Sequence, residues 1–538
     1  MTEGREYAAL AAVAAVSFAL RFVPYALSGV PYHTDTWPQI ENANVLLSRT
    51  PVPLSPASGF DNYNVYWPGL TLFTAVLSRL LGAGPYWLMP VAAPVVSSLS
   101  FVILAVFLRR LGMGLASSSL SSLISGVVLG STLITAGATK EAYAFPLMFT
   151  FALLFTISLK EGRIGFISLS LLTFVSLLIS HHLTSVVSIL LAVYLLAFEL
   201  VAVKRRLDWP AARCIAAVVA ATVFSLYYFF IYASPVQLVV ITPSFVISVV
   251  SYELAMLLPL SLGLGLSRGG AFAKYWTSGV LCLALFLPLY SVGFSVTANA
   301  PVIPAWLLLI AAPYLVILVL SVPSYLLSHA HGWHGGLGFS AFWGLGLLGI
   351  LMFEAFGTPG DMGVALRIAD FVFPAAVVAA VSLLSRLGSG GVRKLGLASL
   401  TVFVAASSLI GVLWVSYASG QLGGSQRVYF QSDVAAAGWV AAHASSGERI
   451  YGDARYSYLM SLHPSVNVLL GGGYRVVYTG SFSSPGCLIL SSLISQVGYV
   501  GGEYGLPVNM TKIASLVASA PALPYTSGET RLVCSYSG

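Results

Sequence analysis

The stretch PGLTLFTAVLSRLLG, residues 68–82, decides how this chain is arranged. It is apolar, but it is shorter than the roughly 20 residues that a helix needs to cross a bilayer. Arg79 also interrupts it near its end. Segments of this length often lie at a membrane surface, so two arrangements are open: 68–82 either crosses the membrane or stays at its surface.

Long apolar runs flank this segment on both sides. One precedes it at 7–28, and a polar, proline-rich stretch from Gly29 to Pro68 lies between them. The runs that follow fall at 87–108, 117–137, 142–159, 164–180, 183–203, 211–233, 245–266, 275–296, 303–327, 337–356, 367–386 and 395–417. We therefore expect an all-α polytopic membrane bundle of about 13 transmembrane helices over residues 1–417, counted from these runs at roughly 20 residues a span.

The distribution of lysine and arginine chooses between the two arrangements. If 68–82 crosses, Arg109, Arg110 and the loop 160–163 lie outside the cell. If it stays at the surface, they lie inside with the cations of the later loops, which are Lys204, Arg205, Arg206, Arg213, Arg268, Lys274, Arg386, Arg393 and Lys394. Cytoplasmic loops carry the excess of such residues, which favours the second arrangement. It predicts a cytoplasmic N-terminus in the cell membrane, an outer loop 29–86, and an extracytoplasmic C-terminal domain.

Composition excludes a soluble protein. Hydrophobic residues make up 58% of the 538 residues, charged residues 8%, and the mean hydropathy is +0.89. Soluble domains are about 25% charged. The formal net charge of +7 fits cytoplasmic membrane loops, so we expect membrane lipids and no nucleic acid among the partners.

The pattern changes after residue 417, where Ser, Gly, Tyr and charged residues increase. We expect a small α/β domain over 418–538. Residues 432–444 have the pattern of an amphipathic helix, and the strands are expected at 449–451, 466–470, 475–478 and 487–490. Cys487 and Cys534 can form a disulfide outside the cell, although two cysteines alone do not establish one. Asn509-Met-Thr511 is a glycosylation sequon.

The candidate catalytic residues lie at the outer ends of spans in this topology. Asp35, in the first outer loop, can act as a general base on an acceptor hydroxyl. The alternative is a helix cap, because Asp35 and Thr36 precede Trp37-Pro38 and proline favours a helix start. Glu141 follows the third span and can orient the acceptor or, with Asp35, hold a metal such as Mg or Mn; its alternative role is an interfacial helix end.

Further residues on this outer side can complete a polar site. Arg367 can bind a lipid phosphate, or snorkel to the interface, or pair with Asp370. Lys140, His181 and His182 are further candidates for the donor phosphate, and the substrate cavity is expected to include His33, Trp37, Tyr66 and Asp361. The histidines 329, 331 and 334 are a weak metal candidate. Glu253 lies within a span with no assigned role.

The order of these features resembles the GT-C superfamily of membrane glycosyltransferases. One span is followed by a long outer loop with an early aspartate, and then by a segment that opens on Tyr66-Trp67-Pro68-Gly69. The next span ends in Arg109-Arg110, and the one after it in an acidic outer turn. Protein O-mannosyltransferases, aminoarabinose transferases and the oligosaccharyltransferase catalytic subunit share this plan.

The resemblance implies two juxtamembrane helices, about 38–48 and 68–82, an aspartate base at Asp35, and an acid at Glu141. It also implies a polyprenyl-phosphate-linked sugar donor, with a protein, glycan or lipid as acceptor. The second loop has one acid rather than a pair, and the WWDxG motif of oligosaccharyltransferases is absent. These departures favour a monosaccharide transferase without a metal. The competing hypothesis is a lipid or sugar transporter or flippase, which would carry its substrate without chemical change.

Overall fold

The computed structural model describes residues 2–49, 63–236, 243–265, 270–290, 307–327, 335–356, 362–387, 390–417, 428–445, 448–500, 505–506, 508–520, 522–527 and 529–535. It divides into two compact units, which we describe separately. The first contains Met1–Phe18, Val96–Thr132 and Ala144–Leu409, and the second contains Ala19–Val95, Leu133–Tyr143 and Ile410–Gly538. Asp361 and the three histidines at 329, 331 and 334 lie outside the described residues.

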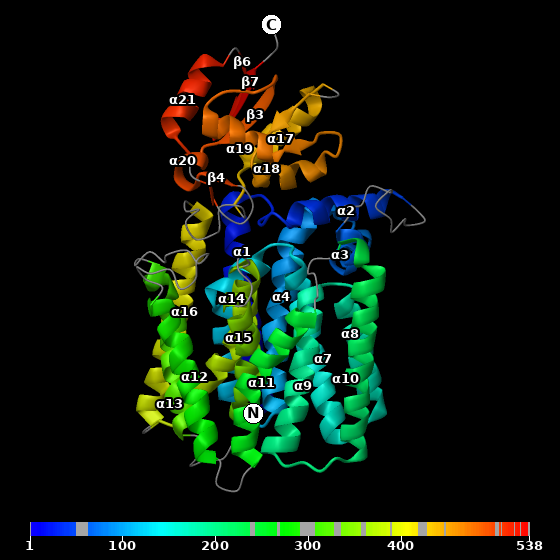
Figure 1. The fold of residues 1–538 in the computed structure, drawn as a ribbon, viewed down its shortest axis with the longest axis vertical. Coiled ribbons are helices and arrows are strands. Elements are labelled where there is room, and N and C mark those ends of the chain that lie inside the picture. Colours follow the sequence, from blue (N-terminus) through cyan, green and yellow to red (C-terminus); the bar gives the residue numbers. More distant parts are fainter. Residues whose placement is uncertain are drawn as a thin grey trace. The chain divides into compact units, whose positions relative to one another are not determined.

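Long helices that run alongside one another make up the first unit (Figure 1). Five helices are divided between the units: α1 (Thr2–Ser28), α4 (Pro85–Arg110), α6 (Leu129–Ala136), α7 (Lys140–Glu161) and α16 (Gly390–Tyr417). The others are α5 (Leu115–Val127), α8 (Ile164–Leu178), α9 (His182–Ala197), α10 (Trp209–Tyr227), α11 (Pro243–Gly265), α12 (Gly270–Tyr290), α13 (Leu307–Leu327), α14 (Gly335–Phe356) and α15 (Met362–Leu384). The π-helical turns η3 (Phe198–Ala202) and η4 (Tyr228–Tyr232) extend α9 and α10.

Burial separates the centre of this bundle from its periphery. The apolar windows of α14 and α15 are 83% and 78% buried, whereas those of α10 and α11 are 22% and 11% buried. Helix α15 packs against α14, α13 and α5. Exposed apolar side chains on a helix such as α10 match a lipid environment, where they cost nothing. The bundle is therefore hydrophobic both inside and on its lipid-facing surface.

Each of the 13 expected ranges contains a helix. Among the described residues, nine helices are long and apolar enough to cross a membrane, or ten if α5 and α6 count as one broken span. Helix α8 and the described part of α13, Ala311–Leu326, are shorter. The polytopic membrane bundle is confirmed, and the count of 13 spans stays a prediction.

The expected continuous span at 117–137 is instead two helices. Val128 is extended, and α5 and α6 meet there at 63°. The break frees backbone groups, which must find partners inside a membrane. The Gly130 amide donates a hydrogen bond to the Tyr314 hydroxyl at 2.6 Å. This tertiary partner stabilises the break, which a hydropathy pattern does not reveal.

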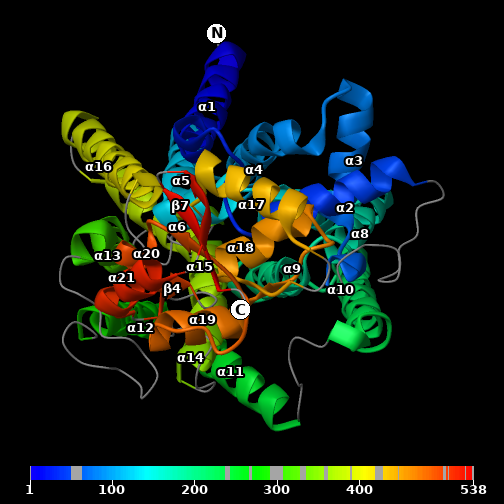
Figure 2. The same ribbon diagram turned by 90° about the horizontal axis from the view of Figure 1, so that it is seen from above.

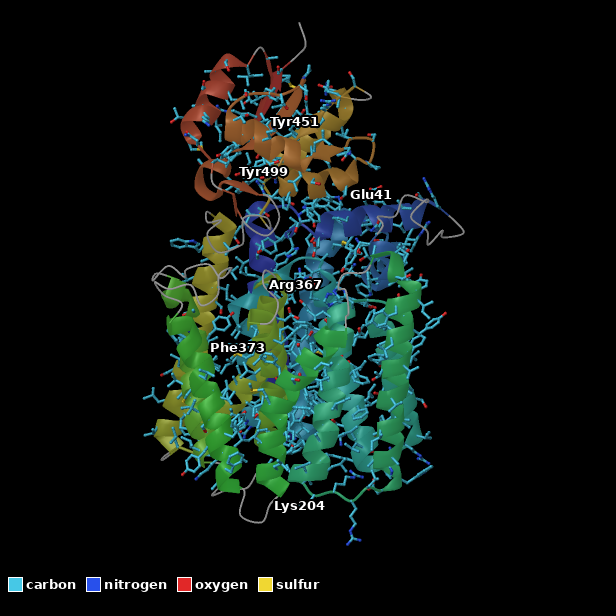
Figure 3. The ribbon with its side chains drawn as sticks, in the orientation of Figure 1. Glu41, Lys204, Arg367, Phe373, Tyr451 and Tyr499 are labelled. Carbon is cyan, nitrogen blue, oxygen red and sulfur yellow. A yellow bond between two sulfur atoms is a disulfide. The ribbon has the colours of Figure 1, made fainter. Side chains whose placement is uncertain are left out.

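Basic loops converge at one face of the first unit. The Lys160 ammonium donates to the Arg110 carbonyl at 2.6 Å, and the Arg213 guanidinium donates to the Gly162 carbonyl at 3.4 Å. Figure 3 places Lys204 at this end of the unit and Arg367 near the other. The loops at Arg110, Lys160, Lys204 and Arg213 therefore share one end of the unit, as the positive-inside rule predicts. Which side of the membrane this end faces stays a prediction.

Short helices from the first loop belong to the second unit. They are α2 (Thr36–Ser48), the 3₁₀ turn η2 (Asn64–Tyr66) and α3 (Gly69–Leu81), so helices form at both expected juxtamembrane positions. A buried hydrogen-bonded group joins them: Gln39 donates to Asn64 at 2.6 Å and accepts from Thr71 at 2.5 Å. On the opposite face of α3, Leu80 is 76% exposed, as expected for a helix at the surface of a membrane.

The C-terminal part of the second unit is a sheet covered by helices. The sheet order is β2-β1-β3-β7-β6, in which β2 (Val468–Leu469), β1 (Ile450–Tyr451) and β3 (Gly486–Ser491) are parallel and β7 (Thr530–Ser535) and β6 (Ala522–Ser527) are antiparallel. The helices are α17 (Gln431–His443), α18 (Ala454–Leu459), the 3₁₀ turn η8 (Met460–Leu462), α19 (Leu470–Thr479), α20 (Ile494–Val497) and α21 (Met510–Ser519). Strands β4 (Tyr499–Val500) and β5 (Gly505–Leu506) form a separate pair.

The sequence-based expectations for this part are mostly confirmed. The helix at 432–444 is α17, and three of the four strands are β1, β2 and β3. The fourth, 475–478, is wrong: these residues are in α19. Parallel strands β2 and β3 need a crossover connection, so a locally strand-like sequence becomes a helix with Val476 and Val477 buried.

The expected disulfide is present. Cys487 and Cys534 are paired residues of neighbouring strands β3 and β7, with their Cα atoms 4.1 Å apart, and they are bonded. The sequon residue Asn509 is exposed and caps α21, its side-chain oxygen accepting from the Thr511 amide at 3.0 Å. Both features are typical of an extracytoplasmic domain, and this location of the C-terminal part stays a prediction.

A buried ion pair fixes the beginning of the C-terminal part. Asp433 and Arg455 are both fully buried and 2.6 Å apart. Arg455 also donates to the Val428 carbonyl, and Tyr456 and Thr530 donate to Asp433 at 2.5 and 3.0 Å. These hydrogen bonds hold the Asp433 carboxylate, and removing one partner of the ion pair would leave a buried charge, at a cost of about 3–5 kcal/mol.

Asp453 makes the stability of this part depend on pH. Burial raises the pKa of its carboxyl from 3.8 to about 6. The protonated form therefore stabilises the fold below about pH 4, and this stabilisation is lost as the pH rises through 6. Asparagine can keep the helix cap that Asp453 makes to the Tyr456 amide at 3.3 Å. At pH 8, Asp453→Asn should raise the unfolding free energy of the intact protein by up to about 3 kcal/mol, measured as a higher thermal midpoint. At pH 4 the midpoint should be unchanged.

Asp208→Asn is the matched control, because Asp208 also caps a helix but hydrogen bonds to Arg205 lower its pKa. It should give no gain at pH 8. A thermal midpoint of Asp453→Asn equal to that of the wild type across pH 4–8 would contradict the burial of this carboxylate.

Candidate functional site

Asp35 stands at the start of α2 without serving as its cap. It occupies the N-cap position, but its side chain makes no capping hydrogen bond, and the carboxylate is 39% exposed. The cap interpretation from sequence therefore does not describe this carboxylate. Two residues earlier, His33 has a φ of +80°, a backbone conformation that non-glycine residues rarely adopt. Such strain persists only where the surrounding structure enforces it, and it concentrates at functional sites.

The His33 ring lies close to Asp35 without neutralising it. Its Nδ1 is 3.8 Å from the carboxylate, and it accepts a hydrogen bond from the Asp35 amide at 3.2 Å. An Nδ1 atom that accepts cannot carry a proton, so the ring proton is on Nε2 and the imidazole is neutral in this arrangement. The Asp35 carboxylate therefore lies beside an imidazole that is hydrogen-bonded to the backbone of the same loop.

The turn between α6 and α7 packs against the loop that carries Asp35. The Thr36 hydroxyl donates to the Tyr32 carbonyl at 2.6 Å and accepts from the Ala138 amide at 3.0 Å. At Gly137, an added Cβ would be 2.5 Å from the Tyr32 carbonyl oxygen and would also overlap His33. Glycine is therefore required for this approach.

Lys140 and Glu141 open α7 directly after this turn. Both side chains are buried, at 6% and 5% exposure. The Lys140 ammonium lies over the Tyr63 ring, 3.5 Å from its centroid, and 5.3 Å from that of Trp67. A desolvated cation–π contact is worth about 2 kcal/mol. The structure thus brings the segments of Asp35 and Glu141 together, and it assigns Lys140 an aromatic contact that the sequence did not predict.

Trp37 joins the first loop to the C-terminal part. Its indole is fully buried, with its ring centroid 5.0 Å from that of Tyr429 and 6.2 Å from that of Tyr86. Helix α2 also packs against α18 and η8, and α2 lies beside α17 and α18 in Figure 2. The first loop and the C-terminal part therefore pack against each other within the second unit. A contribution of Trp37 and Tyr66 to the substrate cavity stays a prediction.

His181, His182 and Arg367 belong to the first unit. His181 caps α9, its Nδ1 lying 2.7 Å from the Thr184 hydroxyl, and its ring is 4.9 Å from that of His182. Arg367 lies on α15 (Figure 3). Their meeting with Asp35 and Glu141 stays a prediction. Glu253 accepts a hydrogen bond from Tyr194 at 2.9 Å, which gives this intramembrane acid a structural partner.

The metal hypothesis was tested on the side chains themselves. Within the described ranges, no three His, Cys, Asp or Glu residues lie close enough to share an ion. Asp35 and Glu141 supply two carboxylates, and Mg²⁺ is commonly held by one or two carboxylates together with water and substrate phosphates. A metal at these two residues stays a prediction.

Solved structures share this arrangement of elements. The oligosaccharyltransferase of Archaeoglobus fulgidus in the apo form aligns with a TM-score of 0.59 and 11% identity, over 93% of this chain and 72% of that chain. The same enzyme, tethered by a disulfide to an acceptor peptide containing the NVT sequon, aligns with a TM-score of 0.57 and 11% identity, over 91% and 69%. The chain has the GT-C fold.

Other comparisons add less. ArnT from Cupriavidus metallidurans bound to undecaprenyl phosphate aligns over 97% of both chains at 12% identity, but a TM-score of 0.36 carries no argument. No family model matches the sequence, and no curated protein matches it. The GT-C fold predicted from the order of spans, first-loop aspartate and acidic turn is nevertheless confirmed.

Two residues of this site were missed by the sequence interpretation. Thr36 is one, and no sequence signal marks its bridging hydroxyl. Arg21 is the other: it is fully buried in α1 and its Nε donates to the Thr135 hydroxyl at 2.7 Å. A single arginine within an apolar run is a signal for a functional position in a GT-C fold or any other membrane protein.

Gly137→Ala tests the seating of the turn. The added methyl group must displace the Tyr32 carbonyl or His33, so we expect a loss of about 1–3 kcal/mol in stability, measured as a lower thermal midpoint in detergent. Gly84→Ala is the control, because nothing lies within 4 Å of a Cβ at that position. Equal midpoints for the two variants would contradict the close approach described here.

Proposed function

We propose that this protein is a membrane glycosyltransferase that moves a sugar from a polyprenyl-phosphate carrier to an acceptor on the outer side of the membrane. The observation that supports it best is the Asp35 carboxylate, which is partly exposed and makes no capping hydrogen bond to its own helix. The GT-C fold, shared with an oligosaccharyltransferase, supports the reaction class. A protein that only transports lipid would have no need for a base held in this way.

Asp35 acts as the general base in this proposal. It takes the proton from the acceptor group as the acceptor oxygen attacks the anomeric carbon of the sugar. The bond between that carbon and the phosphate oxygen breaks, and the lipid phosphate leaves with the bonding electrons. A single displacement of this kind inverts the anomeric configuration. Neutral His33 borders the carboxylate on one side, and buried Glu141 lies on the turn that contacts its loop.

The donor phosphate is proposed to bind Arg367 and the candidates His181 and His182, with Lys140 as a further cation. Arg367 presents a planar guanidinium that can hold a phosphate through two parallel hydrogen bonds. His182 is partly exposed next to the capped His181 and can add a further donor. Lys140 contributes its charge from beneath the aromatic rings of Tyr63 and Trp67. Glu141 is proposed to orient the acceptor, whose chemical class is a protein, a glycan or a lipid.

Asp35→Asn should abolish transfer while leaving the fold intact, because the amide cannot accept the proton. We expect at least a roughly 100-fold lower rate of sugar transfer from a polyprenyl-phosphate sugar in proteoliposomes, within the usual range for loss of a general base. Glu41→Gln is the matched control: Glu41 lies on the same helix, and burial raises the pKa of its carboxyl (Figure 3). The control should keep wild-type activity. Full activity of Asp35→Asn would exclude this mechanism.

Chelation tests the metal-free form of the proposal. The second loop carries one acid rather than a pair, so transfer should survive an excess of EDTA with less than a roughly threefold change in rate, far below the loss typical of a missing catalytic metal. Re-addition of Mg²⁺ or Mn²⁺ should then have no effect. Inactivation by EDTA with recovery on adding either metal would assign Asp35 and Glu141 as its ligands instead.

A further inference from the structure

Arg21 is a charged side chain with no exposed surface in the first apolar helix. It lies two turns before the end of α1 at Ser28, among apolar residues on both sides in the sequence. An arginine at such a position is costly in a membrane and is kept where it has a defined partner. One such partner is the Thr135 hydroxyl, which lies 2.7 Å from the Arg21 Nε and is itself fully buried.

Thr135 is well placed to transmit this contact. It is the penultimate residue of α6, the second half of the broken span. The next three residues are Ala136, Gly137 and Ala138, and the last two contact the first loop through His33, Tyr32 and Thr36. Thr139 then caps α7 by accepting from the Ala142 amide at 3.1 Å.

Contacts with other segments therefore fix three positions along this turn. Arg21 holds it from α1 at Thr135, Thr36 holds it at Ala138, and the rings of Tyr63 and Trp67 receive Lys140. Glu141 follows with no intervening residue. Because α6 is detached from α5 by the 63° break, the contact with Arg21 replaces the support that a continuous helix would give.

We infer that Arg21 is a positioning residue for sugar transfer, which acts through Thr135 to hold the turn of Glu141 against the loop of Asp35. This role rests on the proposed function. The guanidinium touches neither donor nor acceptor in this scheme. Its loss lets the turn move away from Asp35, and displacements of about 1 Å at a reacting centre can cost a factor of 100 in rate.

The kinetic test removes the hydrogen bond between Arg21 and Thr135 by replacing either residue. Arg21→Met and Thr135→Val should each lower kcat about 10- to 100-fold, with the KM for a polyprenyl-phosphate sugar changed less than about threefold. The double variant should be no slower than the slower single variant, because both remove the same bond. Thr135→Ser keeps the hydroxyl and should restore activity to near that of the wild type. Arg79→Met, on α3 where Arg79 donates to the Leu47 carbonyl at 2.6 Å, is the matched control and should keep activity.

A labelling test reports on the turn without any need for activity. Ala138 is 1% exposed, so Ala138→Cys in a Cys282→Ala background should resist a membrane-impermeant maleimide. Addition of Arg21→Met should make it react at least several times faster. If Arg21→Met does not accumulate, Thr135→Val tests the same bond while keeping the arginine.

The outcomes separate the two proposals. A wild-type protein that transfers no sugar overturns the proposed function and this role of Arg21 with it. A wild-type protein that transfers sugar, with wild-type kcat for Arg21→Met or Thr135→Val, overturns the positioning role alone. Multiplicative losses in the double variant, or unchanged labelling of Ala138→Cys, also overturn it.

Discussion

The hydroxyl of Thr36 joins two segments that are a hundred residues apart, and the candidate site depends on this contact. One segment is the loop of Asp35, and the other is the turn that opens on Glu141. The hydroxyl accepts from the Ala138 amide and donates to the Tyr32 carbonyl, so it satisfies a backbone group on each side. Without it, two polar loops would meet with unpaired groups, which is expensive in a buried setting.

The second structural constraint is the burial of Trp37. An indole with no exposed surface needs neighbours on all sides, and α2 alone cannot supply them. Tyr429 does so from the beginning of the C-terminal part, and the Tyr429 hydroxyl is in turn fixed by the Arg455 carbonyl at 3.0 Å. The C-terminal part thus supports the first loop. This explains why Ala19–Val95 and Ile410–Gly538 form one compact unit.

Local sequence predicted the elements whose stability is local. The apolar runs, the segment 68–82 and the helix at 432–444 follow from hydrophobic length and periodicity, whereas the helix near 38–48 was implied by the family resemblance. Prediction from local sequence was wrong where residues distant in the chain determine the structure. Residues 475–478 are helical because two parallel strands need a crossover, and residues 117–137 break because Tyr314 receives a freed amide. The burial of Asp433 beside Arg455, and the contact of Arg21 with Thr135, likewise depend on tertiary pairing. For the site, Asp35 and Glu141 could be named from sequence, but the residues that hold them could not.

The position of β7 within the sheet has a consequence for biosynthesis. This strand contains the last residues of the described chain, yet it lies between β3 and β6 and carries half of the disulfide to Cys487. The sheet therefore cannot close until the ribosome has made β7. Trp37 precedes β7 by almost five hundred residues, so its indole waits for its cover from the C-terminal part while the spans between them are inserted. The loop that carries Asp35 thus reaches its final structure only after β7 has been made.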